Sequence, residues 1–195
     1  MKKTKIVALD IGGVCVHLQP EKALAYFNLS NLPARSLQLF DQLERGQLAE
    51  NDFITQAAAL LPETVSAEKF MTGWAMIIGE AMEGMNELVE EFSHKRGVEF
   101  VFLSDISTFH LRVIRERFYS EQFISNGIYS FEVGAKKPES PMYEAFEKNY
   151  GKPILYTDDR QVCIDGGKKF NWNTYQFQSA AGLREKLNLI LSQID

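Results

Sequence analysis

The first apolar stretch of the chain leads directly into a glycine turn: Ile6-Val7-Ala8-Leu9-Asp10-Ile11-Gly12-Gly13-Val14. Four consecutive apolar residues without alternation are typical of a strand that is buried on both faces, as in a parallel sheet. The two glycines after Asp10 permit a tight turn and a close approach of the backbone to a ligand. The stretch therefore predicts a central parallel strand that delivers Asp10 to a ligand site at its carboxyl end.

Strand and helix patterns alternate through the second half of the chain. Strands are predicted at 98–103, within 123–131, at 154–156 and at 173–177, and helices at 85–96, 107–118, from 139, at 161–169 and at 180–192. Strands that alternate with helices of this length are typical of an α/β fold with a doubly wound parallel sheet.

A long helical segment separates the first strand from this alternating part. Residues 20 to about 92 carry helical patterns and no strand signal, with helix starts at Pro20, Pro33, Glu50 and Ser66. The pattern predicts a helical cap inserted after the first strand. We expect residues 1–16 and 86–195 to form the α/β core, and residues 17–85 to form the cap.

Composition limits the possible partners and the compartment. The 195 residues have a net charge of −5, which argues against binding of a nucleic-acid backbone. No apolar run is long enough to span a membrane, so we expect no membrane partner. Cys15 and Cys163 form no disulfide pattern, so a reducing cytoplasm is the simpler expectation.

Acidic residues follow three of the predicted strands. They are Asp10, Asp105 beside the hydroxyl of Ser104, and the pair Asp158 and Asp159. Because the carboxyl ends of parallel strands meet at one edge, these side chains should gather there. Clustered carboxylates repel one another unless a cation neutralises them, and an oxygen-rich set suits Mg²⁺.

A lysine in a glycine-containing loop complements the acidic cluster. Lys137 lies in the segment Gly134-Ala135-Lys136-Lys137-Pro138, before the helix that leads to the fourth strand. Phosphoryl transfer needs positive charge near the transferring group. An aspartate can act as the nucleophile in such chemistry and form an aspartyl-phosphate intermediate.

The order of these segments resembles the four motifs of the haloacid dehalogenase superfamily, in the subgroup with a helical cap. Asp10 to Val14, Ser104, Lys137-Pro138 and Asp158-Asp159 carry the resemblance, which covers nearly the whole chain. The first motif, the later Lys-Lys-Pro and the Asp-Asp pair are similar to those of sugar-phosphate phosphatases such as the alpha-glucose-1-phosphate phosphatases. The resemblance implies a Mg²⁺-dependent hydrolase of a small phosphorylated metabolite, with sugar phosphates among the candidates.

The same resemblance implies a role for each matched position. Asp10 would be the nucleophile and a Mg²⁺ ligand, and the Gly12 carbonyl would be a second ligand. Ser104 and the amide of Asp105 would hold the phosphoryl oxygens, and Lys137 would neutralise the nucleophile and the phosphate. Asp159 would hold the metal, and Asp158 would hold either a metal-bound water or Lys137.

Position 12 departs from the family pattern. The typical first motif has a second aspartate there, which serves as general acid for the leaving group, whereas Gly12 has no side chain. Without this acid, leaving groups of low pKa should be favoured, such as those of anomeric sugar phosphates, aryl phosphates or acyl phosphates. His17 is a candidate for the missing proton donor.

A second departure keeps two other functions open. Related phosphatases place a neutral residue where this chain has Asp105, and a carboxylate beside a phosphate is repulsive unless it is protonated or turned away. One alternative is therefore a catalytically impaired binding or regulatory protein with the same fold. The other is a 2-haloacid dehalogenase, which needs no metal, and the Asp158-Asp159 pair argues against it.

Overall fold

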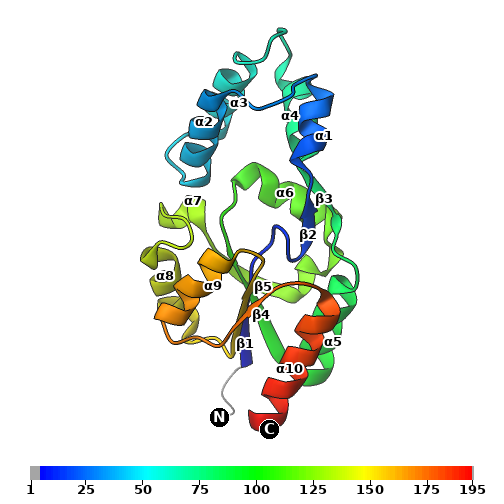
Figure 1. The fold of residues 1–195 in the computed structure, drawn as a ribbon, viewed down its shortest axis with the longest axis vertical. Helices are drawn as coiled ribbons and strands as arrows, with labels where there is room; N and C mark the ends of the chain where they lie inside the picture. Colours follow the sequence, from blue (N-terminus) through cyan, green and yellow to red (C-terminus); the bar gives the residue numbers. More distant parts are fainter. Residues whose placement is uncertain (1–4, 195) are drawn as a thin grey trace.

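The computed structural model describes residues 5–194, except for the side chains of Lys95 and Ser125. A parallel sheet with helices on both faces forms the lower body, and four helices form a separate unit above it (Figure 1). The α/β fold class and the doubly wound parallel sheet predicted from the sequence are both confirmed.

Five strands form the main sheet in the order β5-β4-β1-β6-β7. They are β1 (Lys5–Leu9), β4 (Val98–Ser104), β5 (Ile124–Tyr129), β6 (Leu155–Asp158) and β7 (Thr174–Gln176). All neighbouring pairs are parallel. The apolar strand β1 is central, with Val7 paired to Phe100 on one side and to Leu155 on the other.

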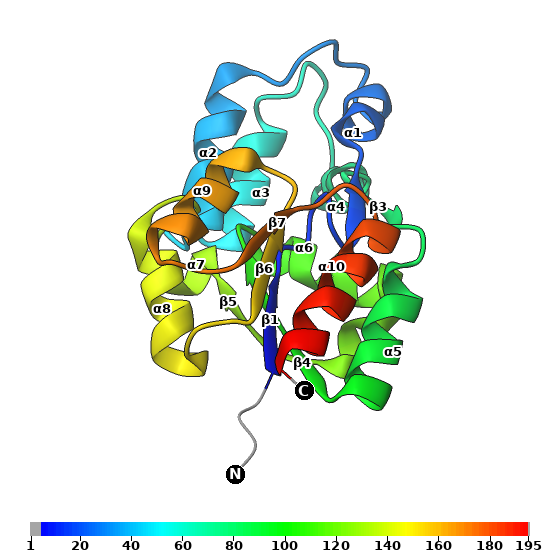
Figure 2. The same cartoon turned by 60° about the horizontal axis from the view of Figure 1, so that its bottom comes forward.

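Helices cover both faces of this sheet (Figure 2). One face carries α5 (Met85–Arg96), α6 (Thr108–Arg117) and α10 (Ala180–Ile194), and the other carries α8 (Ser140–Tyr150) and α9 (Gln161–Lys169). The short helices η1 (Tyr119–Phe123) and α7 (Ser130–Val133) flank β5. Alternate residues of β1 serve the two faces, since Val7 and Leu9 join one hydrophobic cluster while Ile6 and Ala8 join the other.

The upper unit has its own hydrophobic core. It contains α1 (Pro20–Tyr26), α2 (Ala34–Glu44), α3 (Glu50–Ala58) and α4 (Ala67–Ala75). Phe53, Phe70 and Trp74 lie at the centre of this core and are nearly inaccessible to solvent. The unit therefore packs as a helical cluster of its own. The boundaries 1–16, 17–85 and 86–195 remain a prediction.

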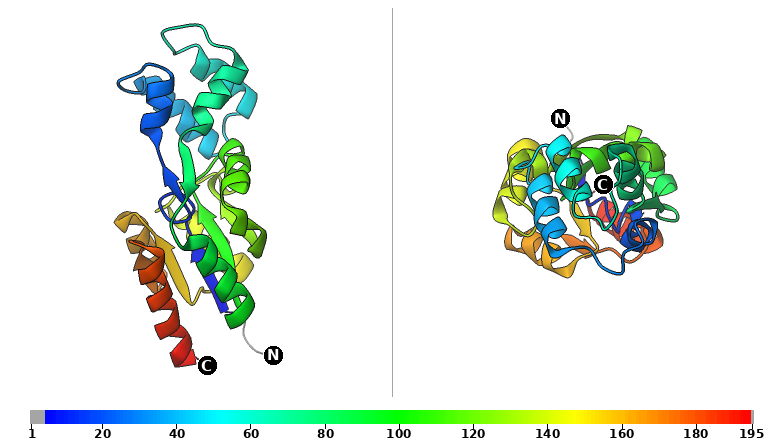
Figure 3. Two further views of the ribbon diagram at one scale, coloured as in Figure 1. Left: turned by 90° about the vertical axis from the view of Figure 1, so that its right-hand side faces the viewer. Right: turned by 90° about the horizontal axis from the view of Figure 1, so that it is seen from above.

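Two short antiparallel strands join this unit to the sheet body, as the left view of Figure 3 shows. They are β2 (Val16–Leu18) and β3 (Ile78–Ala81). The expectation of no strand between residues 20 and about 92 is wrong at β3. Gly79 weakens the strand signal there, yet it allows close pairing, because a Cβ atom at this position would lie 2.9 Å from the Cβ atom of His17.

Among the described residues, no helix combines the length and the apolar content that crossing a membrane requires.

Candidate active site at the carboxyl edge of the sheet

Three carboxylates meet at the carboxyl edge of the sheet. Asp10 follows β1, Asp158 ends β6 and Asp159 comes next, and each offers a ligand oxygen within 4.8 Å of the other two. Asp158 is fully buried, Asp10 is nearly so, and Asp159 is partly exposed. The topology of a parallel sheet thus brings together the acids that the sequence analysis selected.

Lys137 and Ser104 hold the first of these carboxylates. The Nζ atom of Lys137 lies 2.9 Å from Asp10 Oδ1 and 2.6 Å from Asp158 Oδ2. Ser104, the last residue of β4, donates a hydrogen bond from Oγ to Asp10 Oδ1 at 2.9 Å. Asp158 also accepts hydrogen bonds from the Tyr156 hydroxyl and the Arg160 amide. Asp158 therefore contacts Lys137 directly, one of the two alternatives that the resemblance left open.

The charges in this cluster do not balance. Burial raises the pKa of Asp10 to about 7, with Lys137 opposing the rise and Asp158 adding to it. Burial alone would lower the pKa of Lys137, but the charges of Asp10 and Asp158 outweigh it and raise that pKa. Burial and the charge of Asp158 also raise the pKa of Asp159. Lys137 and, more distantly, Arg160 thus face three carboxylates, an arrangement that a divalent cation would stabilise.

The structure explains how Asp105 is tolerated beside a phosphate-binding residue. Its Oδ1 accepts a hydrogen bond from the Lys137 amide at 2.8 Å, and its Oδ2 accepts one from the Arg160 guanidinium, also at 2.8 Å. Each carboxylate oxygen of Asp105 therefore has a hydrogen-bond donor, and the Arg160 guanidinium offsets its negative charge. This role of Arg160 was not predicted from the sequence, although its position directly after the Asp158-Asp159 pair was a usable signal.

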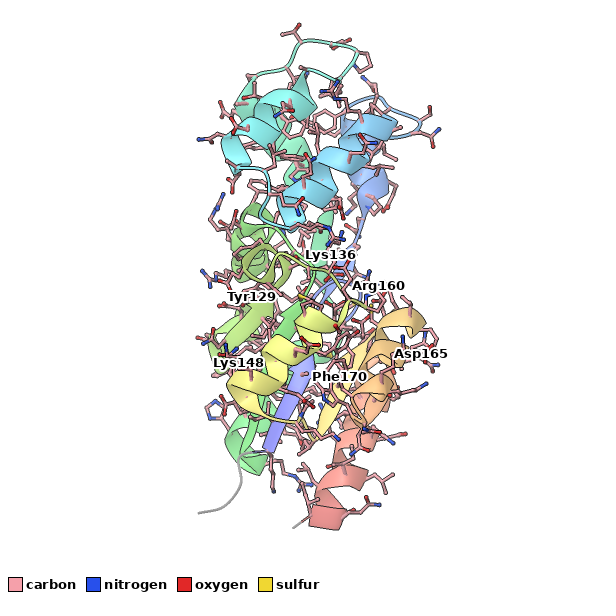
Figure 4. All side chains as sticks on the ribbon, turned by 90° about the vertical axis from the view of Figure 1, so that its left-hand side faces the viewer. Tyr129, Lys136, Lys148, Arg160, Asp165 and Phe170 are labelled. Atoms are coloured by element: carbon pink, nitrogen blue, oxygen red, sulfur yellow. The ribbon has the colours of Figure 1, made fainter. Side chains whose placement is uncertain are left out.

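A cavity of about 360 Å³ opens between the upper helices and this edge of the sheet. Its sheet side contains Asp10, Gly12, Ser104, Asp105, Asp159 and Arg160. Figure 4 shows Lys136 and Arg160 at the waist between the two parts of the molecule. Larger cavities of about 510 and 520 Å³ lie elsewhere and contain none of the three clustered carboxylates. We therefore take the cavity beside Asp10 as the candidate active site.

His17 does not lie at this site. It lines a different cavity, together with Met82 and Phe177, whereas the neighbouring Leu18 faces the cavity beside Asp10. Successive residues of a strand point to opposite sides, which explains why one of these two residues reaches the site and the other does not. The structure therefore gives no support to His17 as the proton donor that position 12 lacks.

Charged residues of α2 close one side of the cavity against the sheet body. Glu44 is buried and accepts a hydrogen bond from Lys136, which also contacts Asp41. Arg45 forms a bidentate pair with Glu139 at 3.0 and 2.7 Å. Lys136 thus belongs to a half-buried ion-pair network, because the fold brings helix α2 against residues 136–139.

Comparisons with known proteins find relatives of full length. No protein-family model matches the chain. A D-ribitol-5-phosphate phosphatase from Bacteroides thetaiotaomicron is 23% identical and covers 96% of this chain and 98% of its own length.

Solved structures with a similar fold are also found. A HAD family enzyme from the same organism, solved with magnesium and inorganic phosphate, is 18% identical with a TM-score of 0.78, over 90% of this chain and 94% of its own. A HAD-like family hydrolase from Porphyromonas gingivalis is 17% identical with a TM-score of 0.72, over 89% and 90% of the two chains. These likenesses establish the fold.

Proposed function

We propose that the chain, which has the fold of the haloacid dehalogenase superfamily and segments that resemble its four motifs in order, is a Mg²⁺-dependent phosphatase of a small phosphorylated metabolite. The observation that carries the proposal is the contact of Asp10 with both Ser104 and Lys137 beside two further carboxylates. The phosphatase named among its relatives and the neighbour with bound magnesium and phosphate support the same reaction class.

Asp10 is the nucleophile in this proposal. A carboxylate oxygen of Asp10 attacks the phosphorus atom while the bond to the leaving oxygen breaks, and that oxygen takes the electron pair. Water then attacks the phosphorus of the aspartyl-phosphate, which releases inorganic phosphate and restores the carboxylate. The ion pair with Lys137 fixes the orientation of this carboxylate for the attack.

The phosphoryl oxygens would be held by groups at the same edge. We assign this role to the Ser104 hydroxyl, the amide of Asp105 and the Lys137 ammonium. Lys137 is suited to it because its pKa is raised, so it stays positively charged while negative charge builds up on the transferring group.

The donor set suits a magnesium ion. Asp10, the Gly12 carbonyl and Asp159 would hold the ion, with Asp158 behind them and bonded to Lys137. Asp159 fits a metal ligand, since its carboxylate has no side-chain partner among the described residues. When bound, the ion would offset the carboxylate charge and stabilise charge on the phosphoryl group.

A cytoplasmic location belongs to the same proposal. Cys15 and Cys163 are both free and buried, as is usual in a reducing compartment.

The variant Asp10→Asn tests the function. We expect the wild-type protein to hydrolyse p-nitrophenyl phosphate and acetyl phosphate in the presence of Mg²⁺, and the variant to fall to the background rate because an amide is a poor nucleophile. Asp165→Asn is the matched control, since Asp165 is exposed on α9, away from the site (Figure 4).

Three results would contradict this assignment. Turnover that persists in Asp10→Asn would exclude Asp10 as the nucleophile. Chloride release from 2-chloropropionate without metal would point to a dehalogenase. Failure to hydrolyse either phosphate, together with no Mg²⁺ binding by calorimetry, would point to a binding or regulatory protein.

A further inference from the structure

Most of the residues that line the active-site cavity are apolar, and they include Leu18, Leu37, Phe40, Trp74, Ile77 and Ile106. These apolar residues form what we call the apolar wall of the cavity. Leu18 and Leu37 are 51% and 55% exposed, although large apolar side chains usually avoid solvent. Exposed apolar groups in a concave surface mark a ligand-binding site, so this wall should contact an apolar part of the substrate.

Two of the polar side chains near this wall, Glu44 and His110, are already paired. Glu44 accepts a hydrogen bond from Lys136, and the His110 ring lies within hydrogen-bond distance of the Trp74 carbonyl. The indole nitrogen of Trp74 has no partner among the described residues, but it is closed off from solvent. A sugar or polyol against these apolar side chains would lose water from several hydroxyl groups and find few partners for them, which is unfavourable.

The reacting end of the cavity lacks a free proton donor. Gly12 has no side chain, and Asp105 is bonded to Arg160 and to the Lys137 amide. Among the described residues that line the cavity, the remaining carboxylic acids are the proposed nucleophile, a proposed metal ligand and the paired Glu44, and the Lys136 ammonium is held by Glu44 and Asp41. The leaving oxygen must therefore depart without a side-chain acid, which favours a phenol, with a pKa of about 10, over an alkyl alcohol.

We propose that the substrate is an aryl phosphate, whose ring lies between Leu18, Leu37 and Phe40 while its phosphate lies at Asp10 and Ser104. This inference rests on the proposed function and specifies its substrate class. A cavity of about 360 Å³ is large enough for one ring-sized group beyond the phosphate. The apolar wall and the missing acid are independent observations, and both point to the same leaving group.

A substrate comparison tests this class. With Mg²⁺ present, kcat/KM for phenyl phosphate should exceed the values for hexyl phosphate and D-ribitol 5-phosphate by about a hundredfold each. An equal or higher value for either competitor would overturn the inference while leaving phosphatase activity intact. If phenyl, p-nitrophenyl, acetyl and hexyl phosphate and D-ribitol 5-phosphate are all inert, the proposed function fails together with the inference.

A binding experiment tests the wall separately from turnover. Phenylphosphonate and methylphosphonate are stable probes that share the phosphorus group and differ in the ring. Leu37→Gln should raise the Kd of phenylphosphonate about 5- to 10-fold by calorimetry with Mg²⁺ and leave that of methylphosphonate unchanged. Leu189→Gln is the matched control, because Leu189 is 54% exposed on α10, outside the cavity. An unchanged Kd for phenylphosphonate in Leu37→Gln would overturn the inference.

Restoring an acid at position 12 tests the leaving-group argument. A Cβ atom there would lie 2.9 Å from Leu18 Cδ1, the end of a flexible exposed side chain, so a larger residue can be accommodated. Compared with Gly12→Asn, Gly12→Asp should have a kcat for hexyl phosphate that is about a hundredfold higher. Its kcat for phenyl phosphate should differ much less. Equal effects on both substrates, or equal effects of Asp and Asn, would overturn the inference.

Discussion

At the scale of single residues, Arg160 decides whether a carboxylate at position 105 is compatible with phosphate binding. Its guanidinium is bonded to Asp105 and also lies 3.8 Å from an oxygen of Asp158. Its pKa is raised by Asp105 against the effect of burial, so it stays charged. A neutral residue at 105 would need no such partner. The Asp105–Arg160 pair is thus one unit whose members should be replaced together.

Removing Arg160 alone should weaken phosphate binding. In Arg160→Ala the Asp105 charge is exposed beside Ser104, and KM for p-nitrophenyl phosphate should rise about tenfold, equivalent to about 1.4 kcal/mol of repulsion. The double variant Asp105→Asn/Arg160→Ala should recover most of this loss, as measured by steady-state kinetics. If the double variant is as poor as the single one, Arg160 contacts the phosphate directly and does not act through Asp105.

At the scale of elements, the end of helix α2 is held against the sheet body by charge and by close packing. Glu44 and Asp41 share Lys136, and Gly46 follows the helix with a φ of +67°. A Cβ atom on Gly46 would lie 2.2 Å from the Phe131 carbonyl oxygen, so only glycine fits this contact. The side of the cavity formed by α2 is therefore fixed by the Glu44–Lys136 pair, which lines the cavity, and by the contact of Gly46 with Phe131 outside it.

The buried charge of Glu44 depends on Lys136. Lys136→Met should lower the free energy of unfolding by about 2 kcal/mol in urea titrations, because it leaves Glu44 buried without its cation. Burial already raises the pKa of Glu44, so protonation limits this loss. The free energy of unfolding should fall less in Lys136→Met/Glu44→Gln than in the single variant. It should be almost unchanged in Lys148→Met, because Lys148 is exposed. A double variant less stable than the single one would contradict this account.

At the scale of the whole molecule, His110 joins the upper helices to the sheet body. It lies on α6, is 3% exposed, and stacks on Trp74 of α4 with ring centres 5.3 Å apart. Burial lowers its pKa to about 4, with Arg117 adding to this effect, while the bond to the Trp74 carbonyl and the charge of Glu50 oppose it. The imidazole is therefore neutral in the folded protein near pH 7.

The free energy of unfolding should consequently decrease in mild acid. The unfolded chain binds a proton at His110 near pH 6.5, whereas the folded chain does so only near pH 4, so this contribution to stability is lost as the pH falls between them. Between pH 7 and pH 5 the free energy of unfolding of the wild type should fall by about 2 kcal/mol more than that of His110→Phe. Urea titrations at both pH values measure this difference, with His94→Phe as control; equal losses in all three proteins would contradict the assignment.

The sequence predicted the sheet body well because its signals are local. Helix α5 begins at Met85 and ends at Arg96, as its periodicity and Gly97 predict, and the apolar run at 98–103 forms β4. The carboxyl-edge rule for parallel sheets then placed Asp10, Ser104 and Asp158 together without any knowledge of their contacts.

Other features depend on contacts between distant residues, which a single sequence does not reveal. Strand β3 contains Gly79 and, in the part of the chain that the structure describes, pairs only with β2, so this partner outweighs the weak strand propensity. The pairing of Lys136 with Glu44 joins residues that are 92 positions apart, and that of Arg160 with Asp105 joins residues that are 55 apart. Their charges were visible in the sequence, but their partners were not.

The paired strands β2 and β3 also bear on how such a molecule can diversify. Val16 pairs with Ala81 and Leu18 with Ile78, so the chain leaves the sheet body and returns to it at neighbouring points. The intervening helices are therefore one long hairpin loop in topological terms. Such a loop can be lengthened, shortened or exchanged without changing the order of β1 and β4 or the positions of Asp10 and Ser104. Substrate selectivity can thus evolve through changes in the inserted helices while the reacting residues stay in place.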